Sequence, residues 1–221
     1  MSMTLIYAIG DIHGCLNKLD GLLLRCEKHA DGSPMNFVFL GDYIDRGPQS
    51  RGVIDYLIDL QSRLGECVVT LKGNHEAIAL AVVDGMSPAE LWLSQGGTKT
   101  LDSYGITEPN ELPRAHLDWM RALPLRYDDG RRFFVHAGVN PERPLEAQDD
   151  DDLLWIREPF LSYRGDYGRL IVHGHTPVSG GMPELRDNRL NLDTAAVFGG
   201  PLTAAIFDDT HTLPIGFLQA G

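Results

Sequence analysis

The sequence predicts an α/β fold, because stretches with strand and helix character alternate through its first half. The apolar runs Leu5–Ile9, Phe37–Leu40 and Val68–Leu71 have the length and composition of buried strands. Each run is followed by a segment with apolar residues at helical spacing, and these segments lie at 16–26, 53–60 and 76–83. Strands that are joined through helices pair in parallel, so we expect the three runs to share one sheet.

The second half of the chain has a different pattern. Residues from about 84 to 123 contain short helical pieces separated by glycine and proline, which predicts a helical insertion that contributes to substrate selectivity. The segments Leu125–Asp128 and Arg132–His136 predict a hairpin, with Asp129-Gly130 as the turn between them. The acidic stretch 142–152 is expected to be a solvated surface loop. The last third is expected to form a mostly antiparallel second sheet from runs at 170–173, 189–192, 202–207 and 212–217.

Composition limits the class of protein. With 221 residues and 43% apolar residues, the chain is expected to form a single domain, 1–221, with a substantial core. The net charge of −12 argues against broad affinity for nucleic acid or for anionic membranes. No apolar run is long enough to span a bilayer, and the start of the chain is interpreted as a strand and not as a signal peptide. Three widely spaced cysteines predict no disulfide framework, which favours a cytoplasmic location.

Five short polar segments each close an apolar run, and they are the most informative feature of the chain. Each contains oxygen or imidazole ligands, usually beside glycine, and an open α/β sheet gathers its active site at the carboxyl ends of its strands. We therefore expect the five segments to converge. They are Gly10-Asp11-Ile12-His13-Gly14, Gly41-Asp42-Tyr43-Ile44-Asp45-Arg46-Gly47, Gly73-Asn74-His75-Glu76, His136-Ala137-Gly138 and His173-Gly174-His175-Thr176.

The ligand types in these segments predict a site for two metal ions that share the carboxylate of Asp42. The first ion is expected to be held by Asp11, His13 and Asp42, and the second by Asp42, Asn74, His136 and His175. Asp11 and His13 are separated by one residue, so on extended backbone both would point the same way. The mixed oxygen and nitrogen ligands suit Mn²⁺, Fe or Zn²⁺ better than Ca²⁺. His173 is expected to hydrogen-bond to a ligand or, as the second alternative, to be a further ligand itself.

The remaining polar residues of the segments fit the hydrolysis of a phosphate ester. His75 is expected to be the general acid that protonates the leaving oxygen, with Asp45 orienting it. Arg46 and Arg157 are expected to bind the phosphate oxygens. Two alternatives compete on the sequence alone: an ion pair between Asp45 and Arg46, and a surface pair between Arg157 and Glu158. In this scheme two cations share a water or hydroxide, which attacks the phosphorus in line.

Together the first three segments resemble the motifs of the calcineurin-like metallophosphoesterases, and more narrowly those of the phosphoprotein phosphatases. The segment Trp92–Gly97 and the sequence Asn191-Leu192-Asp193-Thr194 are similar to those of bacterial and bacteriophage-lambda type serine/threonine phosphatases, although Ala195 stands where that type commonly has glycine. The resemblance implies a two-sheet mixed β sandwich flanked by helices and Mn²⁺-supported hydrolysis of phosphomonoesters. It also implies the same roles for the ligands, the catalytic pair and the two arginines named above.

Two other functions stay open. The related symmetrical diadenosine tetraphosphate hydrolases typically have alanine at the position of Asp45 and aspartate at that of Glu76, so this chain resembles the phosphatases more. A non-catalytic metal-binding scaffold would be expected to lack His75 or a ligand. The expected substrate is a phosphoprotein, on serine, threonine or also tyrosine, or a small phosphorylated molecule.

Overall fold

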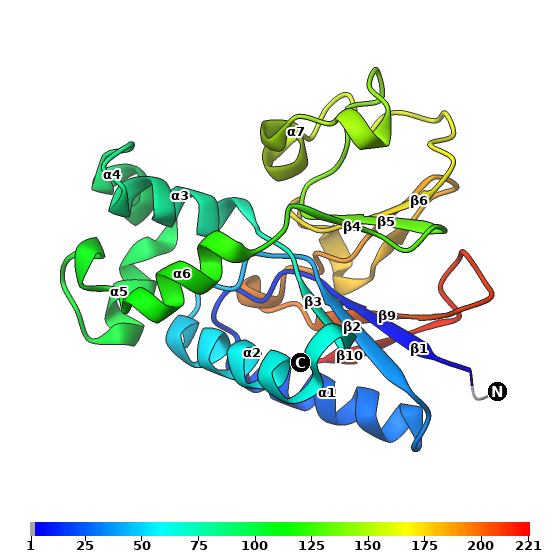
Figure 1. Ribbon diagram of the computed structural model, residues 1–221, viewed down its shortest axis with the longest axis horizontal. Helices are drawn as coiled ribbons and strands as arrows, with labels where there is room; N and C mark the ends of the chain where they lie inside the picture. Colours follow the sequence, from blue (N-terminus) through cyan, green and yellow to red (C-terminus); the bar gives the residue numbers. More distant parts are fainter. Residues whose placement is uncertain (1–2) are drawn as a thin grey trace.

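Two five-stranded mixed β-sheets pack face to face, with helices around them, in the computed structural model, which describes residues 3–221 (Figure 1). This arrangement confirms the two-sheet α/β fold. Within 3–221, no helix is both long and apolar enough to cross a membrane.

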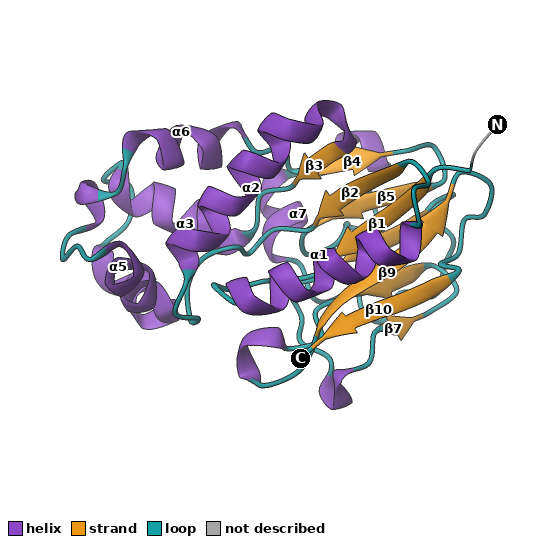
Figure 2. Ribbon diagram, turned by 90° about the horizontal axis from the view of Figure 1, so that it is seen from below, coloured by secondary structure: helices purple, strands orange, loops and turns teal. Residues whose placement is uncertain are grey.

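The first sheet is built around the strands predicted from the first half of the chain. β1 (Leu5–Ile9), β2 (Met35–Phe39) and β3 (Val68–Thr70) are parallel and adjacent in the order β1-β2-β3. They are joined through α1 (Leu16–Ala30) and α2 (Ser50–Leu64), which lie side by side over the outer face of this sheet (Figure 2). The apolar residues at helical spacing in both helices are buried against the sheet, which is why these segments form amphipathic helices.

The expectation of a mostly antiparallel second sheet is wrong, because two of the expected strands lie in the first sheet and the central strands of the second sheet are parallel. β9 (Leu202–Asp208) and β10 (Gly216–Ala220) belong to the first sheet, where β9 pairs antiparallel with β1. All seven residues of β9 are buried, because α1 covers one face of this sheet and the second sheet covers the other. A strand buried on both faces lacks the alternating pattern that would reveal which sheet it joins.

The second sheet has parallel central strands and antiparallel edges. β5 (Arg132–Val135), β6 (Leu170–His173) and β8 (Arg189–Asn191) are parallel. β4 (Arg126–Asp128) forms the predicted hairpin with β5, and β7 (Glu184–Leu185) pairs antiparallel with β8. Parallel β5 and β6 end at the same edge of this sheet, so His136 and the segment 173–176 meet there.

The segment 84–123 is helical, and its helices lie at one end of the two sheets (Figure 2). It contains α4 (Ala89–Trp92), a π-helical turn at Leu93–Gly97, α5 (Thr98–Tyr104) and α6 (Arg114–Ala122). α3 (Asn74–Val83) precedes it and begins two residues earlier than its apolar pattern indicates.

The expected acidic loop is partly helical. α7 (Asp150–Trp155) begins within the run of four aspartates, with Asp149 at its N-cap position. Negative side chains in the first turn of a helix are favoured by its dipole, which explains why this run does not simply remain an extended loop.

Arg132 ties the two sheets together. Its side chain is almost completely buried, donates at 2.7 Å to the carboxylate of Asp129, and donates at 3.1 Å to the main-chain carbonyls of Asp208 and His211. Its guanidinium also lies over the ring of Phe207, 4.7 Å from the centroid. One side chain of the second sheet therefore holds the turn between β9 and β10 of the first.

We expect Arg132→Met to lower the free energy of unfolding by about 3 kcal/mol or more, because it leaves Oδ2 of Asp129 and the carbonyls of Asp208 and His211 without their side-chain donor. Denaturant unfolding of the variant and the parent protein measures the difference. Arg131→Met is the matched control, since Arg131 is exposed. Equal midpoints for the two variants would contradict a tie between the sheets.

Candidate active site

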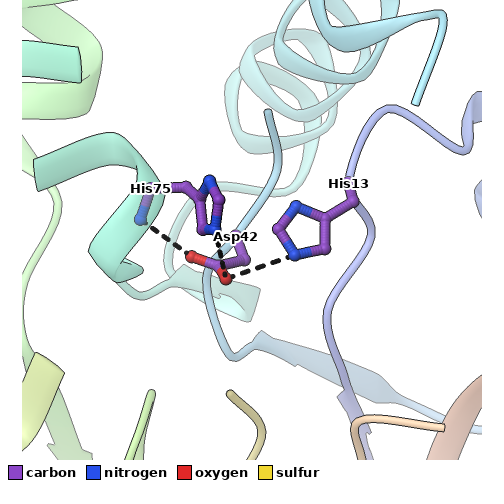
Figure 3. A group of neighbouring side chains, drawn as sticks. All are labelled: His13, Asp42 and His75. Atoms are coloured by element: carbon purple, nitrogen blue, oxygen red, sulfur yellow. Dashed lines mark hydrogen bonds and ion pairs between the residues drawn. The ribbon is translucent and has the colours of Figure 1, made fainter. Parts of the chain in front are cut away.

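The predicted segments converge at the carboxyl ends of the strands, around the carboxylate of Asp42. One of its oxygens lies 3.4 Å from Nε2 of His13, and the other lies 3.4 Å from Nε2 of His136. Nε2 of His75 lies 4.0 Å from the oxygen that faces His13 (Figure 3). The two oxygens thus face different histidines, as expected for a carboxylate shared by two ions.

Two groups of side chains have the spacing of metal ligands. His13, Asp42 and His75 form one group, and Asp42, His136 and His175 form the other, with the donor atoms of each group within 4.8 Å of one another. All of these side chains are buried. His75, which the sequence predicts to be an acid and not a ligand, belongs to the first group.

Hydrogen bonds to the main chain orient the histidine rings for metal binding. Nδ1 of His13 lies 2.7 Å from the carbonyl of Ile44, and Nδ1 of His136 lies 2.8 Å from the carbonyl of Leu40. A carbonyl only accepts, so both Nδ1 atoms carry the proton and both Nε2 atoms keep a lone pair. Burial lowers the pKa of His13 to about 3, so its Nε2 stays unprotonated at neutral pH.

Asn74 lies between the histidines of the second group. Its Oδ1 is 2.8 Å from Nε2 of His136 and 3.0 Å from Nδ1 of His175. Oδ1 is an acceptor, and so is the unprotonated Nε2 of His136. Two acceptors that face each other at this distance are typical ligands of one cation. The residues present therefore fit divalent metal ions.

Asp11 lies at the same centre but faces a neighbouring loop. Its carboxylate accepts from the main-chain N–H of His175 at 3.0 Å. Asp11 and His13 do not share the extended backbone expected of them, because His13 has φ 44, in the left-handed region. A turn brings His13 toward Asp42, and Asp11 belongs to neither of the two ligand groups found among residues 3–221.

The charges at this centre are unbalanced. Burial, Asp193 and Asp42 raise the pKa of Asp11. Burial alone would raise the pKa of Asp42 as well, but the imidazoles of His136, His75 and His13 hold it below its usual range. Buried carboxylates this close to one another need positive charge, which bound cations supply.

Glu76 braces the loops that carry the ligands. Its buried carboxylate accepts from the N–H groups of Asp42, Tyr43 and Gly73 at 2.8–2.9 Å, and from that of Ile44 at 3.2 Å. Four donors to one side chain join the loop after β2 to the start of α3. The sequence identifies Glu76 as part of a motif but predicts no structural role for it.

Asp45 and His75 form a buried pair. Nδ1 of His75 lies 2.7 Å from Oδ2 of Asp45, so Nε2 faces the centre. Burial lowers the pKa of His75, but the charge of Asp42 and the hydrogen bond that His75 donates to Asp45 outweigh burial and raise the pKa above its ordinary value. None of the ion pairs formed by residues 3–221 joins Asp45 to Arg46, so the structure gives no support to that alternative.

Trp92 and Thr100 also donate to Asp45, and the sequence assigned no role to either. Nε1 of Trp92 lies 2.9 and 3.0 Å from the two carboxylate oxygens, and the hydroxyl of Thr100 lies 2.7 Å from Oδ1. Trp92 belongs to the segment Trp92–Gly97 that resembles the bacterial phosphatases, and this resemblance was the one feature of the sequence that pointed to a role for it.

Arg46 and Arg157 line one cavity of about 480 Å³ together with His75, Asp42 and Asn74. Nη1 of Arg46 lies 2.7 Å from Nε2 of His13, and its guanidinium lies 5.7 Å from the ring centroid of the exposed Phe198. Arg157 is exposed, and among residues 3–221 it forms no ion pair with Glu158. Both arginines are therefore placed where an anion in the cavity would meet them.

His173 lies beside the centre without touching it. Its Nδ1 lies 3.1 Å from the carbonyl of Gly174, its Nε2 lies 3.4 Å from Nη1 of Arg189, and its ring packs edge-on against Phe160. It belongs to neither ligand group among residues 3–221 and hydrogen-bonds to no predicted ligand. Its side chain packs beside Arg189 and Phe160, contrary to both expectations.

A comparison with known families agrees with this geometry: residues 4–207 match the calcineurin-like phosphoesterases. The chain belongs to this family. It is therefore a metal-dependent phosphoesterase, and its two ligand groups around Asp42 are the candidate metal centre of that activity.

Among the relatives of this phosphoesterase are two kinds of enzyme by name. It is 32% identical to serine/threonine-protein phosphatase 1 of Salmonella typhimurium, with 90% of each chain covered. It is 28% identical to the asymmetrical bis(5'-nucleosyl)-tetraphosphatase PrpE of a Geobacillus species, covering 94% of this chain and 92% of the relative. A solved structure provisionally named as a diadenosine tetraphosphatase is 25% identical, with a TM-score of 0.71 and coverage of 100% and 99%.

We expect the free energy of unfolding of the metal-free protein to decrease as the pH falls, and we expect His173 to account for part of this decrease. Burial and Arg189 lower its pKa to about 3, compared with 6.5 for an ordinary histidine, so between these values the unfolded chain binds more protons. The stabilisation is complete above about pH 6.5 and is lost as the pH falls toward 3, by up to about 1.4 kcal/mol per pH unit.

Denaturant unfolding at several pH values, on metal-free protein, tests this expectation. His173→Gln should show a shallower loss between pH 7 and pH 4 than the parent protein. His29→Gln is the control, since His29 is exposed. Parallel curves for the parent and His173→Gln would contradict the prediction.

Proposed function

We propose that this phosphoesterase is a bacterial-type serine/threonine protein phosphatase that accepts phosphotyrosine as a further substrate. The observation that carries the proposal is the buried Asp45–His75 pair, with Nδ1 of His75 2.7 Å from the carboxylate. Nε2 of His75 then faces the cavity where a phosphate would lie. This arrangement suits an acid that delivers a proton to the departing oxygen.

The need for such a proton depends on the leaving group. The alkoxide of serine or threonine is a strong base and leaves poorly unless it is protonated. A nucleotide phosphate leaves readily by comparison, since its second pKa is about 6. A fixed Asp–His pair therefore supports a phosphomonoester of an alcohol as substrate. The 32% identity to the Salmonella protein phosphatase agrees with it.

The residues of this chain divide the remaining work. Two divalent cations, when bound, would supply Lewis acidity and a nucleophilic water near neutral pH. Asp11, His13 and Asp42 are proposed to hold one, and Asp42, Asn74, His136 and His175 the other; Mn²⁺ suits this mixed donor set, as do Fe and Zn²⁺. Arg46 and Arg157 are proposed to hold the phosphate oxygens, because both line the cavity with His75.

Hydrolysis of a dinucleoside tetraphosphate is the second candidate, favoured by the names of the Geobacillus relative and of the similar solved structure. It would use the same metal centre. Among the residues that the structure describes, the cavity lining offers a chain of four phosphates no Lys or Arg besides the two arginines. Apart from the predicted site residues, this lining is mostly apolar and includes one carboxylate, Asp151. That lining agrees better with a single phosphate.

The test compares two substrates with metal-stripped protein to which Mn²⁺ has been restored. We expect kcat/KM for a phosphoserine or phosphothreonine peptide to exceed that for diadenosine tetraphosphate at least ten-fold. A preference for the dinucleotide would overturn the proposed substrate and keep the metal centre. Activity on neither would leave the scaffold function as the better explanation.

We expect His75→Ala to lose turnover in proportion to the basicity of the leaving group. The loss should be about 10²- to 10⁴-fold on a phosphoserine peptide and much smaller on p-nitrophenyl phosphate, whose leaving group needs little protonation. Metal content of the variant, measured in parallel, should stay at the parent level. Equal losses on both substrates would argue against a general acid.

A further inference from the structure

We propose that Trp92, Gly96 and Thr100 of the helical segment form a clamp that positions Asp45 and Arg46 for catalysis. The inference rests on the acid role proposed for His75 and goes beyond it, because none of the three residues touches the substrate cavity. It changes the expected purpose of segment 84–123, which the sequence linked only to selectivity. These three are positioning residues that act through their neighbours.

The carboxylate of Asp45 is held from two sides. Oδ2 accepts from Nδ1 of His75 at 2.7 Å, while Oδ1 accepts from the hydroxyl of Thr100 at 2.7 Å. The indole N–H of Trp92 lies between the two oxygens, 3.0 Å from one and 2.9 Å from the other. Without these two donors, Oδ1 would have no partner in a fully buried position, and nothing would keep Oδ2 aimed at His75.

Thr100 also fixes the main chain of Asp45. The N–H of Asp45 donates to the hydroxyl of Thr100 at 2.9 Å, and the same hydroxyl donates to the carboxylate of Asp45. Ser50 lies 3.1 Å from both the N–H of Asp45 and the hydroxyl of Thr100. The hydroxyl of Thr100 therefore binds both the main chain and the side chain of Asp45. This holds Asp45 in its left-handed conformation, which has φ 73.

The π-helical turn holds the next residue in the same way. The carbonyl of Gly96 accepts from the N–H of Arg46 at 3.1 Å, and Arg46 has φ 65. A side chain at Gly96 would come within 2.7–2.8 Å of Arg46, so only glycine permits this approach. Left-handed backbone at two consecutive residues other than glycine costs about 1–3 kcal/mol each and persists only where the surroundings enforce it.

The position of Trp92 is itself enforced by packing. Its side chain is fully buried, and a methyl group at Gly97 would come within 2.6 Å of the indole. Packing therefore confines the indole ring to one position, which directs its N–H toward the carboxylate of Asp45. Rigid support of this kind typically changes activity by about 10- to 100-fold when it is lost at a comparable site.

The experiment uses two variants that remove one donor each and keep the shape: Trp92→Phe and Thr100→Val. We expect kcat on phenyl phosphate to fall about ten-fold or more in each, with a smaller fall on p-nitrophenyl phosphate and little change in KM. Thr100→Ser should restore most of the activity, because it keeps the hydroxyl. Trp119→Phe is the matched control: it removes the indole donor to Gln61 at 2.6 Å elsewhere in the same segment.

A double-mutant cycle separates a positioning role from general destabilisation. If Thr100 acts through Asp45, then Thr100→Val should have no further effect in protein that carries Asp45→Ala. Additive losses, equal losses on both aryl phosphates, or no difference between Trp92→Phe and Trp119→Phe would each overturn the clamp. Parent protein that cleaves aryl phosphates but no phosphopeptide would refute the proposed substrate, and the clamp would still be decided by the aryl pair.

Discussion

The carboxylate of Glu76 is the contact on which the active site depends. It is completely buried and accepts four main-chain N–H groups, three of them from consecutive residues of the loop after β2. Buried N–H groups without acceptors would make that loop conformation unstable. An aspartate, one methylene shorter, would not reach across to the loop from α3 with the same main-chain positions. The brace sets Asp42 against Asn74 and His75, so one side chain links two predicted metal ligands and the proposed acid.

Backbone strain at the site explains why such bracing is needed. Seven residues other than glycine have positive φ among 3–221, and five of them are predicted site residues: His13, Asp42, Asp45, Arg46 and His175. Each turn directs a side chain from the end of a strand back toward a common point, where a relaxed backbone would carry it away. These five residues lie in three of the five segments, so backbone strain helps to bring those three together, and main-chain hydrogen bonds to Glu76, Thr100 and Gly96 offset its cost.

Sequence patterns predicted the local features of this molecule and failed where long-range partners decide. The strand-end segments of His13, Asp42 and His136 were identified because glycine and ligand residues follow apolar runs, and all three converge as expected. The sheet that β9 joins was not predictable, because a strand buried on both faces has no alternation. Trp92 and Thr100 lie 47 and 55 residues from Asp45, and a donor at such a distance leaves no periodic trace. Ala195 shows the opposite case: it has φ 60 where similar phosphatases commonly have glycine, so the departure noted in the sequence falls on a left-handed position.

The position of His75 would suit either a metal ligand or an acid. Its hydrogen bond to Asp45 is the feature that favours the proposed acid role. His75 satisfies the same spacing as the ligands, since it groups with His13 and Asp42. Its Nδ1, however, is held by Asp45 at 2.7 Å, and its Nε2 stands 4.0 Å from Asp42, whereas Nε2 of His13 stands at 3.4 Å. We expect loss of Asp45 to leave the ring of His75 without the hydrogen bond that orients it, and so to weaken the proposed delivery of the proton. A site without that carboxylate can still bind metals and cleave bonds with good leaving groups. The clamp on Asp45 therefore bears directly on which phosphate esters the same metal centre is able to hydrolyse.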